Sequence, residues 1–137
     1  MIQDILILIK EEMMMSEIQK QVGNKCEKEY LNVLQEHGYW CHLFTNAISG
    51  QPCDIVAIKD NVAYLIDVKH CDKDRFEFYR IEANQRSCFE YAMSKGNKNV
   101  GFAVYFEAIK EFVYIPYMDI KDFEKKGLKS IRYDYKM

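Results

Sequence analysis

The apolar residues ahead of Gly38 recur at helical spacing, as Tyr30 and Leu34 show. Asn24 is a suitable N-cap and Gly38 a suitable stop, so a helix is predicted between them. Further along, the pattern changes to strand-like runs over 39–44, 53–59 and 62–69. The dipeptide Asp60-Asn61 separates the last two runs and predicts a tight hairpin turn.

The second half continues this alternation. Residues 70–77 read as a charged turn and residues 78–81 as a short extended piece. Helical spacing then predicts helices over 82–95 and 118–126, which Gly96 and Gly127 end. Strands are predicted over 100–106, 111–116 and 128–135. The order α-β-β-β-α-β-β-α-β predicts an α/β fold with a mixed central β-sheet flanked by helices.

The first 22 residues differ from the rest, because they open with an apolar run at 5–9. This run is too short to span a bilayer, and it lacks the basic leader and the cleavage site of a secretory signal. We expect residues 1–22 to form a short helical extension that covers apolar surface on the domain or on a partner subunit. Residues 23–137 form the domain, and a cytoplasmic protein with no membrane association is expected.

Composition and charge narrow the possible class of protein only slightly. The 137 residues suit one domain, and 49% hydrophobic residues suit a real core. The net charge of −2 is mild evidence against a nucleic-acid partner, but local patches rather than net charge hold phosphates. The five cysteines include no Cys-x-x-Cys pair, so reduced thiols are expected and a zinc site lacks its usual ligand spacing.

Charged residues stand at the ends of two strands that are otherwise apolar. Asp54 opens the first strand of the hairpin, and Asp67 and Lys69 close the second. Asp67 and Lys69 are two residues apart and therefore point to the same face. Pairing of Lys59 with Val62 would bring Asp54 close to Asp67, where the two carboxylates repel each other unless a cation sits between them.

Oxygen ligands of this kind suit Mg²⁺ or Mn²⁺. The Val68 carbonyl lies near the same strand edge, and Lys69 would act on a metal-bound water or on a developing phosphorane charge. The constellation therefore favours metal-assisted hydrolysis of a phosphodiester. The alternative is a pair of exposed strand-end acids with Lys69 as an ion-pair partner.

The pattern Pro52-x-Asp54, thirteen residues on to Asp67-Val68-Lys69, resembles the PD-(D/E)XK nuclease superfamily. The resemblance implies a restriction-endonuclease-like αβββαβ core and a glutamate on the preceding helix. Glu27 lies in the first turn of the predicted helix, where the archaeal Hjc-like Holliday junction resolvases carry theirs, and would complete or buffer the metal site. Glu29 is a weaker substitute, and a solvated first-turn acid is the alternative for Glu27.

Two further segments resemble junction resolvases. The loop ISGQPCDIVA is similar to the Ser-Gly segment of the archaeal type, which implies that Ser49 contacts a phosphate unless it is an ordinary turn serine. The stretch 75–123 resembles the bacterial RecU-type resolvases, with Asn84 in place of their histidine. There the resemblance implies that Gln85 reaches the metal site or its water; a hydrogen bond to a buried backbone group is the alternative.

The resemblance covers about residues 23–123, with one departure. The stretch before Asp54 is too short for the RecU stalk insertion, which favours the compact archaeal-like layout. Basic residues after the site would meet DNA phosphates or form a solvated face: Lys73, Arg75, Arg80, Arg86, Lys95 and Lys98. Tyr79 and Phe76 would stack on open bases or pack in the core.

The sequence therefore predicts a magnesium-dependent, structure-selective DNA endonuclease. It resembles a small Holliday junction resolvase of phage or bacterial type, which acts on four-way junctions in DNA recombination and repair. The resemblance implies a homodimer, because two strands must be cut symmetrically. Two alternatives stay open: a restriction- or repair-type nuclease of the same core, and a non-catalytic DNA-binding or interaction domain that retains the fold.

Overall fold

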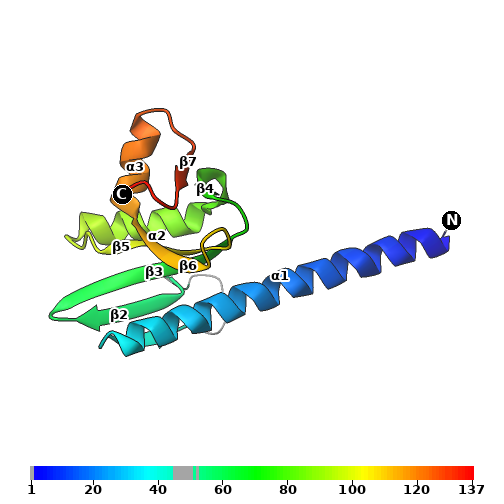
Figure 1. The fold of residues 1–137 in the computed structure, drawn as a ribbon, viewed down its shortest axis with the longest axis horizontal. Coiled ribbons are helices and arrows are strands. Elements are labelled where there is room, and N and C mark those ends of the chain that lie inside the picture. The colour runs from blue at the N-terminus through cyan, green and yellow to red at the C-terminus, as the bar shows by residue number, and fades with distance from the viewer. Residues whose placement is uncertain (1, 45–50, 52) are drawn as a thin grey trace.

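The computed structural model describes residues 2–44, 51 and 53–137. The predicted residues Ser49 and Pro52 lie outside them. Within the described residues a five-stranded sheet has the order β1-β2-β3-β5-β6 (Figure 1). Only β3 and β5 pair in parallel among neighbouring strands of this sheet. Its strands are β1 (Trp40–Leu43), β2 (Ile55–Lys59), β3 (Val62–Cys71), β5 (Val100–Phe106) and β6 (Glu111–Pro116).

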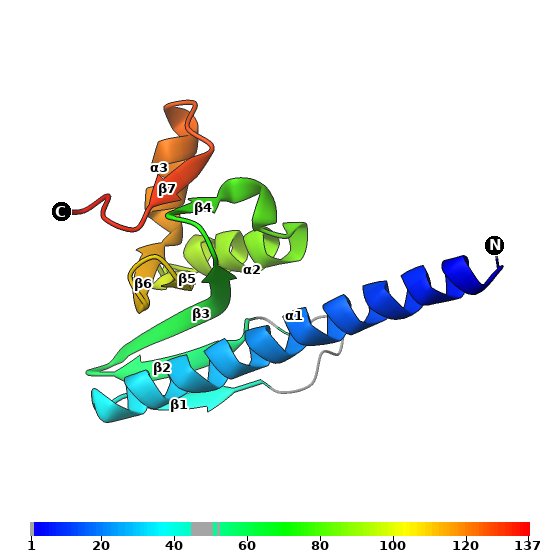
Figure 2. The same ribbon diagram turned by 45° about the vertical axis from the view of Figure 1, so that its right-hand side comes forward.

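Helices cover both faces of the sheet (Figures 1 and 2). One face packs against the C-terminal part of α1 (Ile2–Glu36), where Cys26, Tyr30 and Leu34 join strand residues in one core cluster. The other face carries a second cluster. The elements over it are the two-stranded pair β4 (Arg75–Glu77) and β7 (Ser130–Arg132), the 3₁₀-helix η1 (Phe78–Arg80), α2 (Ala83–Ser94) and α3 (Tyr117–Lys125).

The β2–β3 hairpin forms as the sequence predicts. Asp60 and Asn61 have φ values of 53° and 66°, the left-handed conformation that a two-residue hairpin turn requires. Lys59 pairs with Val62, and Ile55 pairs with Ile66 at the far end. This register continues one step beyond β2 and places Asp54 beside Asp67.

The first helix corrects two predictions. α1 runs unbroken from Ile2 to Glu36, so Asn24 does not cap a helix and Glu27 does not lie in a first turn. Gly23 and Asn24 each disfavour a helix by only about 1 kcal/mol or less, and good helix formers flank them on both sides. The described part of the predicted extension, residues 2–22, is therefore helical but continuous with the helix of the domain.

The segment after β3 also differs from the prediction. β3 extends to Cys71, residues 75–77 form a strand instead of a turn, and residues 78–80 form a 3₁₀-helix instead of an extended piece. The closing strand is confined to Ser130–Arg132, which pairs with β4. These short strands depend on pairing across more than fifty residues, which local periodicity does not reveal. The remaining strands and helices agree with the prediction to within about three residues at each end.

Gly101 in β5 is required by close packing against β6. A Cβ there would lie 2.5 Å from the Ile115 carbonyl oxygen and 3.0 Å from the Pro116 Cα. We therefore expect Gly101→Ala to lower the free energy of unfolding by about 1–3 kcal/mol, because backbone must move to admit the methyl group. Urea denaturation followed by circular dichroism measures this change.

The matched control is Gly23→Ala. Gly23 lies inside α1, and a Cβ there would meet no atom of the described residues within 4 Å. This substitution should raise the stability by up to about 1 kcal/mol through helix propensity. Equal effects of the two substitutions would contradict the close β5–β6 packing.

Candidate functional site

Asp54 and Asp67 hold each other's strands through reciprocal hydrogen bonds. The Asp54 backbone N–H donates to Asp67 Oδ1 at 3.1 Å, and the Val68 backbone N–H donates to Asp54 Oδ2 at 2.8 Å. Gln51 Nε2 donates to the remaining Asp54 oxygen at 3.4 Å. The predicted proximity of the two carboxylates at the hairpin end is thus confirmed.

Asp67 is a buried carboxyl group with an incomplete set of partners. It is 3% exposed, and its Oδ2 has no hydrogen-bond partner among the described residues. Burial, and then the nearby charge of Asp54, raise the pKa of Asp67 to about 7. Burial also raises the pKa of Asp54, against the hydrogen bond from Val68. Such a pair of oxygen donors fits a hard divalent cation, which would supply the missing partner for Oδ2.

Val68 presents main-chain atoms to the same place. The backbone groups of Leu65 and Cys71 pair with the β5 side, as the bonds from the Leu65 N–H to the Asn99 carbonyl and from the Glu107 N–H to the Cys71 carbonyl show. Because backbone groups alternate sides along a strand, those of Val68 point toward the β2 side, where its N–H donates to Asp54. Its carbonyl faces the same edge of β3, beyond the start of β2.

Glu27 approaches the pair from α1 without joining it. Burial, and then the charge of Asp54, raise the pKa of this half-buried carboxyl to about 7. Within residues 2–44, 51 and 53–137, however, no three His, Cys, Asp or Glu side chains come close enough together to hold a metal ion. The role of Glu27 as a metal ligand therefore stays a prediction. A role in buffering the charge of the metal site suits a residue that acts on Asp54 from a distance.

Lys69 lies beside the carboxylates on the α2 side of the sheet. Burial lowers its pKa, and the charges of Asp67 and Glu82 oppose that shift. Its Nζ donates a long hydrogen bond of 3.5 Å to the Arg80 carbonyl oxygen. The ammonium group therefore stays near the acids although it is largely shielded from water.

Gln85 lies on α2 as predicted, and its amide oxygen serves the helix. Gln85 Oε1 accepts a hydrogen bond of 3.0 Å from the Glu82 backbone N–H in a capping box. Its predicted action on metal or water stays a prediction. The sequence reasoning missed Glu82, whose charge raises the pKa of both Asp54 and Asp67. The capping-box spacing of Glu82 and Gln85 was the available signal.

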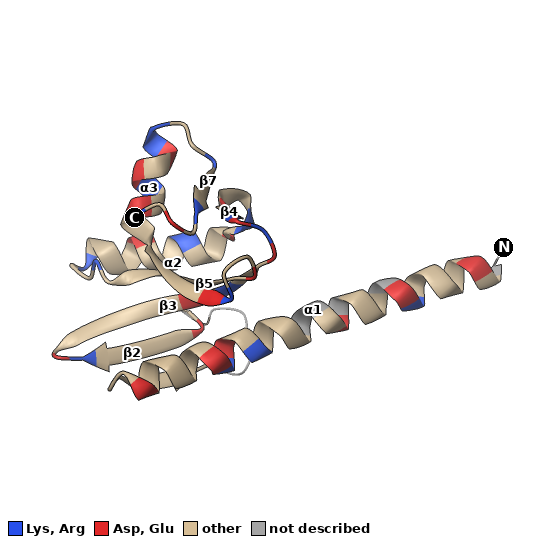
Figure 3. Cartoon of the chain, in the orientation of Figure 1, with Lys and Arg blue, Asp and Glu red and all other residues tan. Residues whose placement is uncertain are grey.

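A groove of about 740 Å³ begins at the site and runs along the end of β3. Its lining joins α1 residues to the predicted DNA-contacting residues Lys73, Arg75 and Arg80, with Lys69 among them and Asp72 and Glu77 interleaved. Arg80 lies over the Phe76 ring at 5.6 Å. Figure 3 shows this mixture of basic and acidic positions around the end of β3.

Other predicted contacts lie elsewhere. Arg86 is not among the lining residues of the groove; it makes a bidentate pair with Glu124, at 2.9 and 3.0 Å. Of the two aromatics, Phe76 is fully buried in the core, whereas Tyr79 lines the groove and is 83% exposed. The buried neighbours Phe78 and Ile81 anchor the turn that presents Tyr79 to solvent.

No protein family model matches the chain, and no curated protein matches its sequence. A solved structure that matches is that of Archaeoglobus fulgidus Hjc, a Holliday junction resolvase from an archaeal hyperthermophile. The TM-score is 0.57 and the identity 21%, over 70% of this chain and 78% of that chain. This chain has the Hjc fold.

The comparison confirms the predicted fold class and the resemblance to the archaeal type at the level of fold. At 21% identity the comparison supports the fold and not an activity. The resemblance to the bacterial type stays a prediction. No helix in the described part of the chain has the length and apolar content needed to cross a membrane.

The raised pKa values set a pH dependence for the metal-free protein. The folded protein keeps protons on Asp67 and Glu27 up to about pH 7, whereas these groups ordinarily ionise near 3.8 and 4.5. The unfolded chain therefore binds fewer protons between these values, and stability should fall as the pH rises from about 4 to about 7. Urea denaturation at several pH values in the presence of a chelator measures this fall in stability.

Asp67→Asn should raise the free energy of unfolding at pH 8 by about 1–3 kcal/mol, because no charge is then buried at this position. The exposed acid Asp122 provides the control, since Asp122→Asn should leave stability nearly unchanged. A wild-type stability that increases over this pH range would contradict the burial of the carboxyl groups.

Proposed function

We propose that this protein is a magnesium- or manganese-dependent DNA endonuclease of the cytoplasm that resolves four-way junctions by paired nicks. The observation that carries the proposal is the hydrogen-bonded pair of half-buried Asp54 and buried Asp67, with Asp67 Oδ2 unpartnered among the described residues and Lys69 alongside. The fold that presents this site is shared with a Holliday junction resolvase.

The residues present fit a divalent cation. The carboxylates of Asp54 and Asp67 and the carbonyl of Val68 would hold it, and Glu27 would adjust the local charge from α1. When bound, such an ion activates water and neutralises charge on a phosphodiester. Occupation would also offset the burial that raises the pKa values of the two aspartates and the charge of Asp54 that raises the pKa of Asp67 further.

Lys69 would act on the reacting phosphate. Its ammonium group would stabilise the negative charge that develops on the phosphorane oxygens and orient the attacking water. Partial burial strengthens this interaction, since fewer water molecules screen the charge. Gln85 would support the site from α2, whose N-terminus it caps.

The groove offers a path for the DNA backbone away from the site. Lys73, Arg75 and Arg80 would contact phosphates on one side of the scissile bond, and exposed Tyr79 would stack on an unpaired base at the branch. Contacts of this kind read backbone geometry and not base edges. Sequence preference should therefore be modest and binding strongly salt-dependent.

The resolvase reading requires a homodimer. One chain offers one such site, and one site makes one nick, which leaves a junction unresolved. Two sites related by a twofold axis would match the pseudo-twofold symmetry of a four-way junction. A restriction- or repair-type nuclease of this fold is the second candidate, because the mixed charge of the groove lining favours no single DNA shape.

Loss of the carboxylates should abolish cleavage. Asp67→Asn should reduce single-turnover cleavage of DNA by at least about 10³-fold and weaken Mn²⁺ binding, since one ligand charge is lost. Lys69→Met should also cleave poorly, yet bind Mn²⁺ and DNA nearly as the wild type does, because it acts on the chemical step.

Quenched-flow cleavage and calorimetric Mn²⁺ titration provide the two measurements, with Asp122→Asn as the control for both. Unchanged Mn²⁺ affinity in Asp67→Asn would remove the metal assignment. Wild-type rates in Lys69→Met would reduce Lys69 to a structural ion-pair partner. Absence of any cleavage by the wild type with Mg²⁺ or Mn²⁺ would favour the non-catalytic alternative.

Substrate choice separates the two nuclease readings. We expect the protein to bind a four-way junction at least about tenfold more tightly than linear duplex, and to nick opposing strands in pairs. Competition with excess linear duplex, followed by mapping of both nicks, tests this. Equal cutting of linear, nicked, flap and junction DNA would leave the nuclease assignment and remove the resolvase one.

A further inference from the structure

The N-terminal part of α1 projects from the domain as a helical arm, defined here as residues 2–21 (Figures 1 and 2). At 1.5 Å per residue the arm is about 30 Å long. The rest of α1 packs against β1, β2 and β3. Large apolar side chains on the arm are each 47–65% exposed, namely Ile5, Leu6, Ile7, Leu8, Ile9, Met13, Met14, Met15 and Ile18.

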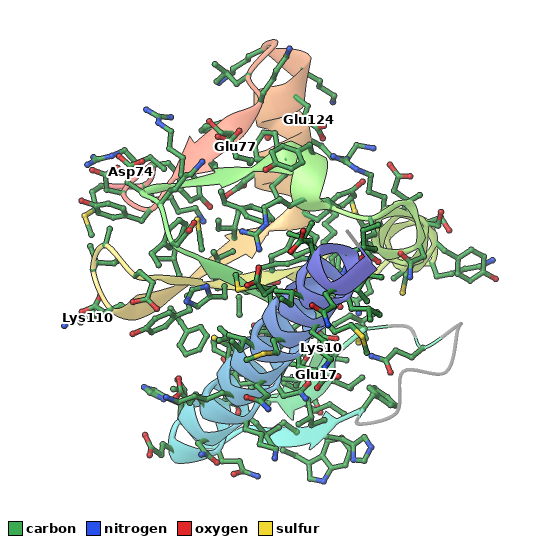
Figure 4. All side chains as sticks on the ribbon, turned by 90° about the vertical axis from the view of Figure 1, so that its right-hand side faces the viewer. Lys10, Glu17, Asp74, Glu77, Lys110 and Glu124 are labelled. Carbon is green, nitrogen blue, oxygen red and sulfur yellow. The ribbon has the colours of Figure 1, made fainter. Side chains whose placement is uncertain are left out.

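Apolar side chains exposed to this extent indicate that the arm binds a partner molecule. Single exposed apolar residues are ordinary, but large apolar side chains exposed together in this number mark an interaction site. Figure 4 views α1 nearly end-on, with Lys10 and Glu17 labelled and side chains spreading to all sides of the helix. The chain itself does not cover the arm, because each described side chain from residue 3 to residue 18 is exposed.

A membrane surface fits the arm poorly. An interfacial helix has one apolar face and a polar face rich in Lys and Arg. Residues 5–9 are consecutive and therefore apolar all round, since five residues exceed one helical turn. The arm also carries more acids than bases, so anionic lipid would repel it: Asp4, Glu11, Glu12 and Glu17 against Lys10 and Lys20.

A second copy of the same arm fits better. Ile7, Glu11, Met14 and Ile18 share one stripe at spacings of four, three and four residues. If two arms run antiparallel about a twofold axis between positions 10 and 11, Ile7 lies opposite Met14 of the partner subunit. Lys10 then lies opposite Glu11 of the partner subunit, and this ion pair forms twice.

The antiparallel arrangement also gives the tip of the arm an apolar partner. In this register the tip, residues 5–9, lies opposite residues 12–16 of the partner's arm, a stretch that contains three consecutive methionines. Methionines facing the tip would adapt to its shape, since their side chains are flexible.

We propose that the arms of two chains pair antiparallel and join them into a dimer. The pairing names a surface for the homodimer of the proposed function, and its test needs no DNA. Sedimentation of the full chain from about 1 to about 100 µM should show a reversible dimer. Met14→Lys should raise its dissociation constant at least about tenfold, because it places a charge in the apolar contact.

Two controls sharpen the test. Met118→Lys makes the same change at an exposed methionine of α3 and should leave the dimer intact. Lys10→Glu should weaken the dimer severalfold, and the double variant Lys10→Glu/Glu11→Lys should restore it, since the swap rebuilds both ion pairs. Circular dichroism checks that each variant keeps its fold, which is expected because these arm side chains are exposed.

The outcomes are distinct. A wild-type chain that stays monomeric at about 100 µM overturns the proposal, as does a dimer that Met14→Lys leaves unchanged. A monomer that binds anionic vesicles would assign the arm to a membrane and also overturn it. A dimer that fails to cleave DNA leaves the arm proposal standing and removes the proposed function. A dimer-deficient variant that still makes single nicks supports both.

Discussion

The structure depends most on the reciprocal hydrogen bonds between Asp54 and Asp67. Each carboxylate accepts a backbone N–H from the opposite strand, so the pairing of β2 with β3 continues past the point where β2 begins. These bonds hold the two carboxyl groups close together where β2 begins, between two inner strands of the sheet. The cost is a buried carboxylate oxygen of Asp67 that has no partner among the described residues, an arrangement that lowers stability by about 1–3 kcal/mol. Carboxyl groups with pKa values raised in this way are found most often at functional sites.

The surrounding structure holds Asp54 and Asp67 in place. The hairpin turn at Asp60-Asn61 sets the register, and a one-residue slip would turn Asp67 and Lys69 to the opposite face. The parallel pairing of β3 with β5 supports the same strand from its other side. The capping box of α2 then places Glu82 near the acids, where its negative charge also opposes the loss of the Lys69 proton. The residues that set the local geometry of the site thus also set its electrostatics.

The sequence was sufficient for the hairpin and for the proximity of Asp54 and Asp67, because both rest on local signals. A two-residue turn fixes a register, and a register fixes which residues face each other, so Asp54 and Asp67 could be paired from spacing alone. β4 could not be predicted in this way, because its partner β7 lies far along the chain. The length of α1 was also missed, since Gly23 and Asn24 are typical of a boundary but do not force one. The placement of Arg86 depends on Glu124 of another helix, which no local pattern reveals.

The continuity of α1 has a mechanical consequence. The same helix carries the exposed arm and Glu27, and it passes through Gly23 without a break. The distance along the helix from Leu8 to Glu27 is about 28 Å at 1.5 Å per residue. If two arms pair, helices of this stiffness would hold the two Asp54–Asp67 sites at a set separation and in opposite directions. A break at Asn24, as the sequence suggested, would have left that separation undefined. In such a dimer the unbroken helix would make the geometry of the two sites a property of one element, and an insertion within the arm would change that geometry without altering either site.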